Sequence, residues 1–353
     1  MIKFIILFFI SILFFNHAFA QDITTEVQEP GKYFYPAYKG GKYGYINQTG
    51  QWMIVPKYDW CGYFYDGYAV AKDTGKFGII NVNGEWLSPP AFDTIKHFNE
   101  GYAAFGSLNN EGKLYWDMID TTAHFMNFKV PALSNLTSMC NGITIGTEEG
   151  FIGFYFLNPK GERVFEAKDF YLDENKVPDF SEGMLHVHLP DGTSTFIDTT
   201  GQLWGKGNYE DCGDFHEGMA WYRDNLKYGY INWLGEKVIV PTYDSTGDFS
   251  EGIALVKTKM IFNSNAMRIE GGVVGYIDRE GKPVTPAIYE AGSAFTDSLA
   301  LVKYNGKYGF IDTKGNTAID FIYNDAFPFM RGLAFVRQDN HWMYINTKGK
   351  KVF

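Results

Sequence analysis

The ten residues from Gly41 to Gly50, GKYGYINQTG, carry the pattern that decides the fold. Closely similar stretches recur at 226–235 (LKYGYINWLG) and 306–315 (GKYGFIDTKG). A repeat of this period predicts a solenoid, a propeller or another array whose units pack on their neighbours. With Gly44 as the reference position, equivalent positions at intervals of 34 to 46 residues define nine units: Gly78, Asp117, Tyr155, Thr195, Gly229, Gly275, Gly309 and Met343.

A turn follows the reference position in each unit. Three residues later stands an Asn or Asp in all nine units, and after three more a Gly in eight of them, with Ala123 as the exception. An Asx side chain accepts hydrogen bonds from nearby backbone, and Gly supplies the left-handed residue that closes a type I turn with a bulge. We therefore expect β-hairpins, and we assign the Asx residues to turns rather than to metal binding or catalysis.

Short apolar runs flank these turns. A phrase F-x-E-G, such as Phe249 to Gly252, precedes a run such as Ile253 to Val256, which is typical of a first strand. On the middle strand both residues after the reference position are apolar, as in Tyr45 and Ile46. Neighbouring strand residues point to opposite faces, so each middle strand must lie between two neighbouring units.

These patterns predict an all-β fold of about nine tandem three-strand meander repeats. A propeller-like ring and an open curved array both bury the two faces. We favour the ring, because the chain starts at a first strand near Tyr35 and stops after a middle hairpin at Phe353. Two such ends could complete one unit together, whereas an open array should need polar caps.

The quoted stretches, with downstream VP-x-YD and F-x-E-G phrases, resemble the WG repeat family. That family usually has Trp before the reference Gly, where this chain has an aromatic residue in the clearer units. The resemblance covers Tyr35 to Phe353 and is weakest in units three and four, about 103–190. It implies an interaction module and transfers no catalytic residue. The aromatic residues are Tyr43, Phe77, Tyr228, Tyr308 and Trp342.

The chain has 353 residues, a formal net charge of −10 and 45 % hydrophobic residues. The acidic balance argues against a nucleic-acid partner. Residues 1–20 combine Lys3, an apolar run over 4–15 and the small residues Ala18 and Ala20, as in a cleaved export signal. An uncleaved membrane anchor is the alternative. We expect a periplasmic or extracellular protein with a linker at 21–34, a repeat domain at 35–353 and no membrane span in the mature chain.

The cysteines and a histidine pair could support redox or metal chemistry. Cys61 and Cys212 share a repeat position where other units have small residues, which predicts buried thiols; pairing of Cys140 with either is the alternative. His186 and His188 would share one face of a strand, but zinc needs a third ligand that the sequence does not locate. We therefore predict no metal and no cofactor.

Irregular positions are the candidates for binding. Trp233 replaces an ordinary turn residue, and we expect it to be exposed. The interval from Gly229 to Gly275 exceeds 34 residues by twelve, which predicts a long hairpin or loop within 257–274. An apolar tip there could contact a partner, and it would contain Met260, Ile261, Phe262 and Met267.

Three functions follow from these patterns. The favoured one is an exported, non-catalytic repeat protein that presents a surface to another envelope or extracellular protein. A glycan-binding module would instead use exposed Trp233, Trp60 or Trp52. An enzyme would need a cleft that holds His186, His188 and acids with displaced pKa values. No P-loop, nucleophile elbow or zinc-protease motif is present in the sequence, so we predict a protein partner and no catalytic residue.

Overall fold

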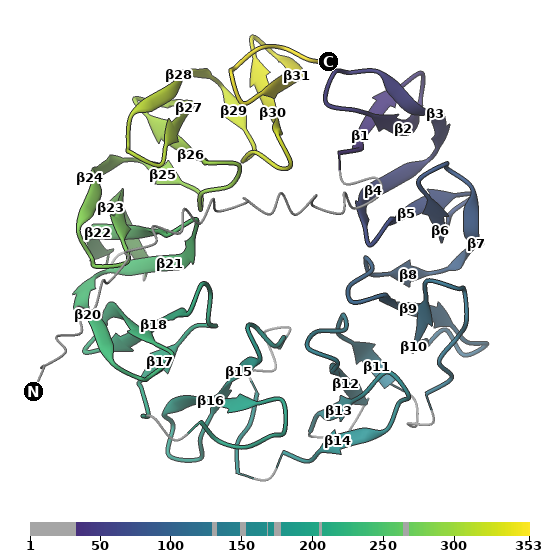
Figure 1. The fold of residues 1–353 in the computed structure, drawn as a ribbon, viewed down its shortest axis with the longest axis horizontal. Helices are drawn as coiled ribbons and strands as arrows, with labels where there is room; N and C mark the ends of the chain where they lie inside the picture. Colours follow the sequence, from purple (N-terminus) through teal and green to yellow (C-terminus); the bar gives the residue numbers. More distant parts are fainter. Residues whose placement is uncertain are drawn as a thin grey trace, which may run out of the picture.

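The computed structural model describes residues 33–128, 133–148, 153–167, 169–172, 178–204, 207–263 and 268–353. These residues form nine antiparallel sheets and no helix. A membrane-spanning helix is therefore not found within these ranges. The sheets are arranged in a ring (Figure 1), and we number them as blades in chain order. The all-β class and the propeller-like ring are thus confirmed.

The strands of the nine blades have the following bounds. Blades 1 to 3 contain β1 (Tyr35–Lys39), β2 (Lys42–Ile46) and β3 (Trp52–Tyr58); β4 (Trp60–Tyr65), β5 (Tyr68–Asp73), β6 (Lys76–Asn81) and β7 (Trp86–Phe92); and β8 (Thr94–Ile95), β9 (Tyr102–Leu108) and β10 (Leu114–Asp120). Blades 4 to 6 contain β11 (Leu133–Leu136), β12 (Thr144–Glu148), β13 (Tyr155–Leu157) and β14 (Arg163–Phe165); β15 (Met184–His188) and β16 (Ser194–Asp198); and β17 (Asp211–Cys212), β18 (Met219–Asp224), β19 (Lys227–Asn232) and β20 (Lys237–Tyr243). Blades 7 to 9 contain β21 (Ser245–Ser250), β22 (Ile253–Asn263), β23 (Arg268–Asp278) and β24 (Pro283–Tyr289); β25 (Ala291–Gly292), β26 (Leu299–Tyr304), β27 (Lys307–Asp312) and β28 (Thr317–Tyr323); and β29 (Asp325–Ala326), β30 (Leu333–Gln338) and β31 (His341–Asn346).

Five blades contain four strands rather than three. The additional strand comes first in its blade and varies in length: β17 and β25 have two residues each, β11 has four, and β4 and β21 have six. In blades 2 and 8 this strand lies on the inner side of the ring and the last strand lies at the outside (Figure 1). The prediction of three-strand meanders was wrong for these blades. A run of two residues, as in β17 and β25, shows no apolar period in the sequence, and β4 and β21 lie in the stretch that leads into the next hairpin.

The Asx-x-x-Gly turns have the predicted chemistry. The Asn47 Oδ1 atom accepts hydrogen bonds from the backbone N–H groups of Thr49 and Gln51, each at 3.0 Å. Gly50 closes the turn with φ of 82°. The turn therefore fixes the join between the middle and outer strands of each regular blade.

The reference Gly is required by a close approach inside its own blade. In blade 8 the ladder between β27 and β28 is irregular around Gly309, where the outer strand bulges. A Cβ atom at Gly309 would lie 2.7 Å from the Ile319 carbonyl oxygen. The bulged backbone thus excludes a side chain at this position.

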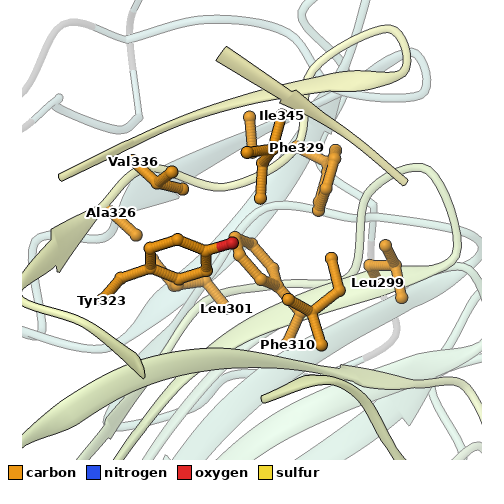
Figure 2. Close-up of a cluster of buried hydrophobic side chains, with 10 residues drawn as sticks. Leu299, Leu301, Phe310, Tyr323, Ala326, Phe329, Val336 and Ile345 are labelled. Carbon is orange, nitrogen blue, oxygen red and sulfur yellow. The ribbon is translucent and has the colours of Figure 1, made fainter. Parts of the chain in front are cut away.

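Middle strands are buried on both faces, as predicted. Tyr45 packs with Cys61 and Phe64 of blade 2, whereas Ile46 packs with Leu333 of blade 9. Figure 2 shows the same arrangement between blades 8 and 9, where Phe310 packs in one cluster with side chains of the next blade. Each interface between blades is therefore a small apolar core. The side chains that blade 9 contributes to this cluster are Ala326, Phe329, Ala334, Val336 and Ile345.

The acidic residue of the F-x-E-G phrase joins one blade to the next. The two carboxylate oxygens of Glu217 accept hydrogen bonds from the backbone N–H groups of Glu251 and Gly252 at 2.7 and 2.8 Å. Glu251 and Gly252 have φ of 54° and 76°, as in a two-residue hairpin turn. Blade 9 has Arg331 at this position, and its guanidinium donates to the Phe64 carbonyl of blade 2 at 2.7 Å.

Side chains near the two ends of the described chain close the ring. The Tyr344 hydroxyl donates to the Pro36 carbonyl oxygen at 3.0 Å. The Trp52 and Phe353 rings meet edge to face, with centroids 5.6 Å apart. These residues belong to separate sheets, blade 9 and blade 1, so the expectation that the ends complete one unit was wrong. Side-chain packing, rather than a shared sheet, closes the ring.

Candidate binding sites

Blade 7 contains an extended hairpin. Its strands β22 and β23 have eleven residues each, whereas β26 and β27 of blade 8 have six. In blade 8 these strands are joined directly by Asn305 and Gly306, with φ of 49° and 76°. The corresponding Lys259 and Gly272 of blade 7 keep this conformation, with φ of 62° and 88°, but twelve residues lie between them. The insertion therefore lengthens the hairpin at the point where a regular blade turns back.

Asp244 holds the base of this extension. The Met260 backbone N–H donates to Asp244 Oδ2 at 3.0 Å, and Lys227 forms an ion pair with Oδ1. These two partners, Lys227 first, hold the pKa of Asp244 below its usual range. In blade 8 Glu290 binds the turn in the same way, accepting from the Gly306 N–H at 2.9 Å. The extension thus starts from the same anchored base as a regular turn.

The predicted apolar residues lie on this extension. Ile261 is 68 % exposed, and Met260 is half-buried. In the ladder Phe262 pairs with Ile269. Met267 lies outside the described residues. The hairpin predicted for 257–274 is confirmed, and it presents at least one large apolar side chain to solvent.

Trp233 lies in the turn between β19 and β20 and is 37 % exposed, as predicted. One face of its ring stacks on Phe215, with centroids 4.5 Å apart and planes 16° from parallel. The indole N–H donates to Glu182 at 3.2 Å. Trp233 therefore packs between blades 5 and 6, and 37 % of its surface stays exposed to solvent.

Trp233 and the extended hairpin are not brought together. Successive turns of an antiparallel meander alternate between the two ends of its strands. Trp233 is in the turn from the third to the fourth strand, whereas the extension is in the turn from the second to the third. The two candidates therefore lie on opposite faces of the ring.

A pocket of about 200 Å³ between blades 5 and 6 gathers titratable side chains. Its wall contains His186 together with Asp179, Asp214 and Asp248. Partial burial of the carboxyl, with Asp214 adding to the effect, raises the pKa of Asp179 to about 6 against the attraction of Lys96. Burial also raises the pKa of Asp248. The pocket brings three carboxyls together, and the one thiol in its lining, that of Cys212, is fully buried.

The second histidine of the pair has a different environment. His188 Nδ1 lies 3.0 Å from the Ser194 hydroxyl, and its ring stacks on Tyr171. His186 and His188 lie on one strand with ring centroids 4.8 Å apart, as their spacing predicts. In the part of the chain that the structure describes, no three His, Cys, Asp or Glu side chains are placed to hold a metal ion.

The cysteines are free thiols in three different blades. Cys61 and Cys212 are buried, as predicted, and burial raises the pKa of Cys61 to about 12. A thiol with so high a pKa is a poor nucleophile at neutral pH. Cys140 is half-buried, with Sγ 2.7 Å from the Phe180 carbonyl oxygen.

A larger cavity, of about 520 Å³, was not predicted from the sequence. It lies where blade 9 meets blades 1 and 2, and we call it the closure cavity. The Phe335 and Trp342 rings stack in its wall, with centroids 4.7 Å apart and planes 14° from parallel. Its lining residues come from both ends of the sequence, so no local pattern could have indicated it. Aromatic side chains dominate the lining: Tyr38, Tyr43, Trp60, Phe335, Trp342 and Phe353.

A family model described as "WG containing repeat" matches six segments that together cover more than half of the chain. Units three and four lie in the unmatched stretch between the second and third segments. No curated protein is similar to the chain in sequence. The matched segments are residues 43–77, 77–106, 195–227, 228–259, 275–308 and 308–342.

Solved structures resemble the chain in fold alone. One is titled "Crystal structure of the eukaryotic initiation factor", with a TM-score of 0.59 and 10 % identity over 91 % of this chain and 95 % of that one. Another is BamB from Moraxella catarrhalis, with a TM-score of 0.44 and 10 % identity over 81 % of this chain and 95 % of that one.

Proposed function

Because this chain belongs to the WG-repeat family, we propose that it is an exported, non-catalytic repeat protein that binds a protein partner through the extended hairpin of blade 7. The ring of blades is the scaffold, and residues 260–271 are the contact element. Repeat proteins commonly bind through insertions that project from one face of the array.

The twelve-residue insertion is the observation that carries this proposal. Lys259 and Gly272 have the backbone conformation of a finished two-residue turn, so the blade does not need the residues between them. The hydrogen bond from the Met260 N–H to Asp244 anchors the base of the extension to the blade. The exposed Ile261 side chain gives this element apolar area for contact with another surface.

Export rests on the sequence of residues 1–20. The apolar run and the Ala18 and Ala20 site predict cleavage after Ala20, which places the ring in the periplasm or outside the cell. A partner in the envelope or the medium follows from that location. The proposal excludes a nucleic-acid partner, since the chain carries a net charge of −10.

Affinity capture with two chains tests the proposal. The chain 21–353 and a copy that lacks residues 260–271 are immobilised and exposed to separated envelope protein and polysaccharide fractions. In the shortened copy Lys259 joins Gly272 directly, as Asn305 joins Gly306 in blade 8. We expect one discrete protein to be retained by the full chain and lost with the hairpin.

A point variant provides the matched control. Ile261→Asp places a charge on the hairpin, whereas Val240→Asp places one on β20 at a residue of similar exposure, 68 % against 66 %. We expect only Ile261→Asp to reduce retention. Retention of polysaccharide instead of protein, or equal loss in both variants, would contradict the proposal.

A further inference from the structure

The closure cavity lies beside blade 1, in which the described residues form no strand before β1. Seven of the nine sheets begin with a strand that precedes the long hairpin, whereas the described part of blade 1 begins with β1. In blade 8 the inner segment donates from the Ser293 N–H to the Leu301 carbonyl at 2.9 Å. The corresponding carbonyl of blade 1, that of Pro36, accepts from the Tyr344 hydroxyl of blade 9 instead.

The inner edge of β1 offers few free backbone groups for hydrogen bonds to a further strand. Pro36 has no backbone N–H, so the inner edge of β1 lacks one of its donors. The Pro36 carbonyl already has a partner in Tyr344. The inner edge of β1 is therefore poorly suited to pair with a further strand.

The lining of the closure cavity is aromatic and carries no charged side chain. Tyr38, Trp60 and Trp342 are 58, 43 and 41 % exposed around it. Tyr63 and Tyr344 also line the cavity, and burial raises the pKa of both phenols, so they stay neutral. A volume of about 520 Å³ is in the range of pockets that bind small molecules.

We infer that the closure cavity is a binding site for a neutral small molecule with one or two flat apolar rings. Aromatic walls such as the Phe335 and Trp342 pair favour stacking with such rings. A charged ligand would lose its hydration with no oppositely charged side chain in the lining. A sugar ring would bury several hydroxyl groups where no carboxylate or amide side chain lines the cavity.

Fluorescence titration of the chain 21–353 with the neutral probe N-phenyl-1-naphthylamine tests this inference. We expect saturable binding of one probe per chain. Trp342→Ala and Tyr38→Ala, both at exposed positions in the lining, should weaken it at least tenfold. Trp233→Ala is the matched control, since Trp233 is similarly exposed but belongs to blade 6.

The inference stands apart from the proposed function, because the closure cavity and the extended hairpin lie in different blades. Unsaturable binding, equal weakening by Trp233→Ala, or no effect of Trp342→Ala and Tyr38→Ala in folded chains would overturn it. Displacement of the probe by cellobiose, but not by unlabelled naphthalene, would overturn it as well, because the site would then recognise sugar hydroxyls.

Discussion

Blades 7 and 8 have the same four-strand topology, but only one of them is extended. Blade 8 turns back through Asn305 and Gly306, whereas blade 7 inserts twelve residues between Lys259 and Gly272. Both anchor the turn with an acidic residue from the preceding segment, Glu290 or Asp244. The comparison therefore distinguishes residues that the fold of a blade requires from the twelve inserted residues, which it does not require.

The packing of blade 8 on blade 9 should be the most sensitive part of the regular structure. Phe329 is buried in the cluster with Phe310, their ring centroids 4.7 Å apart. We expect Phe329→Ala to lower the free energy of unfolding by about 3–5 kcal/mol, because it leaves a cavity in the interface. Urea unfolding measures this loss.

A neighbouring ring gives the control for that variant. Phe327 is 55 % exposed, so Phe327→Ala should change the free energy of unfolding by less than about 1 kcal/mol. Similar losses in the two variants would mean that the buried cluster does not hold the blades together.

Loss of a contact at the ring closure should lower the free energy of unfolding by a smaller amount. Tyr344→Phe removes the hydroxyl that donates to the Pro36 carbonyl while keeping the aromatic ring. We expect a loss of about 1–2 kcal/mol, since the carbonyl then has no partner at the edge of blade 1. Thermal unfolding would show it, and an unchanged midpoint would indicate that this bond does not contribute to closure.

The regular part of the fold could be predicted because each unit repeats the same local chemistry. Asn47 with Gly50 indicates a turn, and Tyr45 with Ile46 indicates a strand buried on both faces. The shortest inner strands could not be predicted, since β25, for example, has only two residues. How the ends meet depends on contacts such as Tyr344 with Pro36, which lie far apart in the sequence.

Asp179 should make a smaller contribution to the free energy of unfolding, and this contribution should depend on pH. Where blade 8 has Ala294 before its buried Phe295, the corresponding residue before Phe180 is Asp179, whose pKa is raised to about 6. The fold therefore favours the protonated acid, and the stability that this group contributes is complete below about pH 4 and is lost as the pH rises through 6.

The variant Asp179→Asn removes this titration. We expect it to be more stable than the native chain at pH 7.5, by less than about 1 kcal/mol because the carboxyl keeps contact with solvent, and no more stable at pH 4. Urea unfolding at the two pH values measures the difference. The same difference at both values would show that the raised pKa does not affect folding.

The candidate sites differ in how far the sequence could indicate them. The extended hairpin was predictable, because an insertion into a strict repeat is visible as a longer interval. Trp233 was predictable as an exposed turn residue, but its stacking on Phe215 was not, since Phe215 lies in a different connection, between β17 and β18. The closure cavity was not predictable, because Tyr38 and Trp342 meet only when the ring closes.

The most direct test of the contrast between blades 7 and 8 is urea unfolding of the chain that lacks residues 260–271. If those residues are displayed rather than structural, the free energy of unfolding should stay within about 1 kcal/mol of the native value, as expected for shortening a hairpin to a favoured two-residue turn. A loss of several kcal/mol, or a second transition, would show that the extension is part of the core of the ring and would contradict the account.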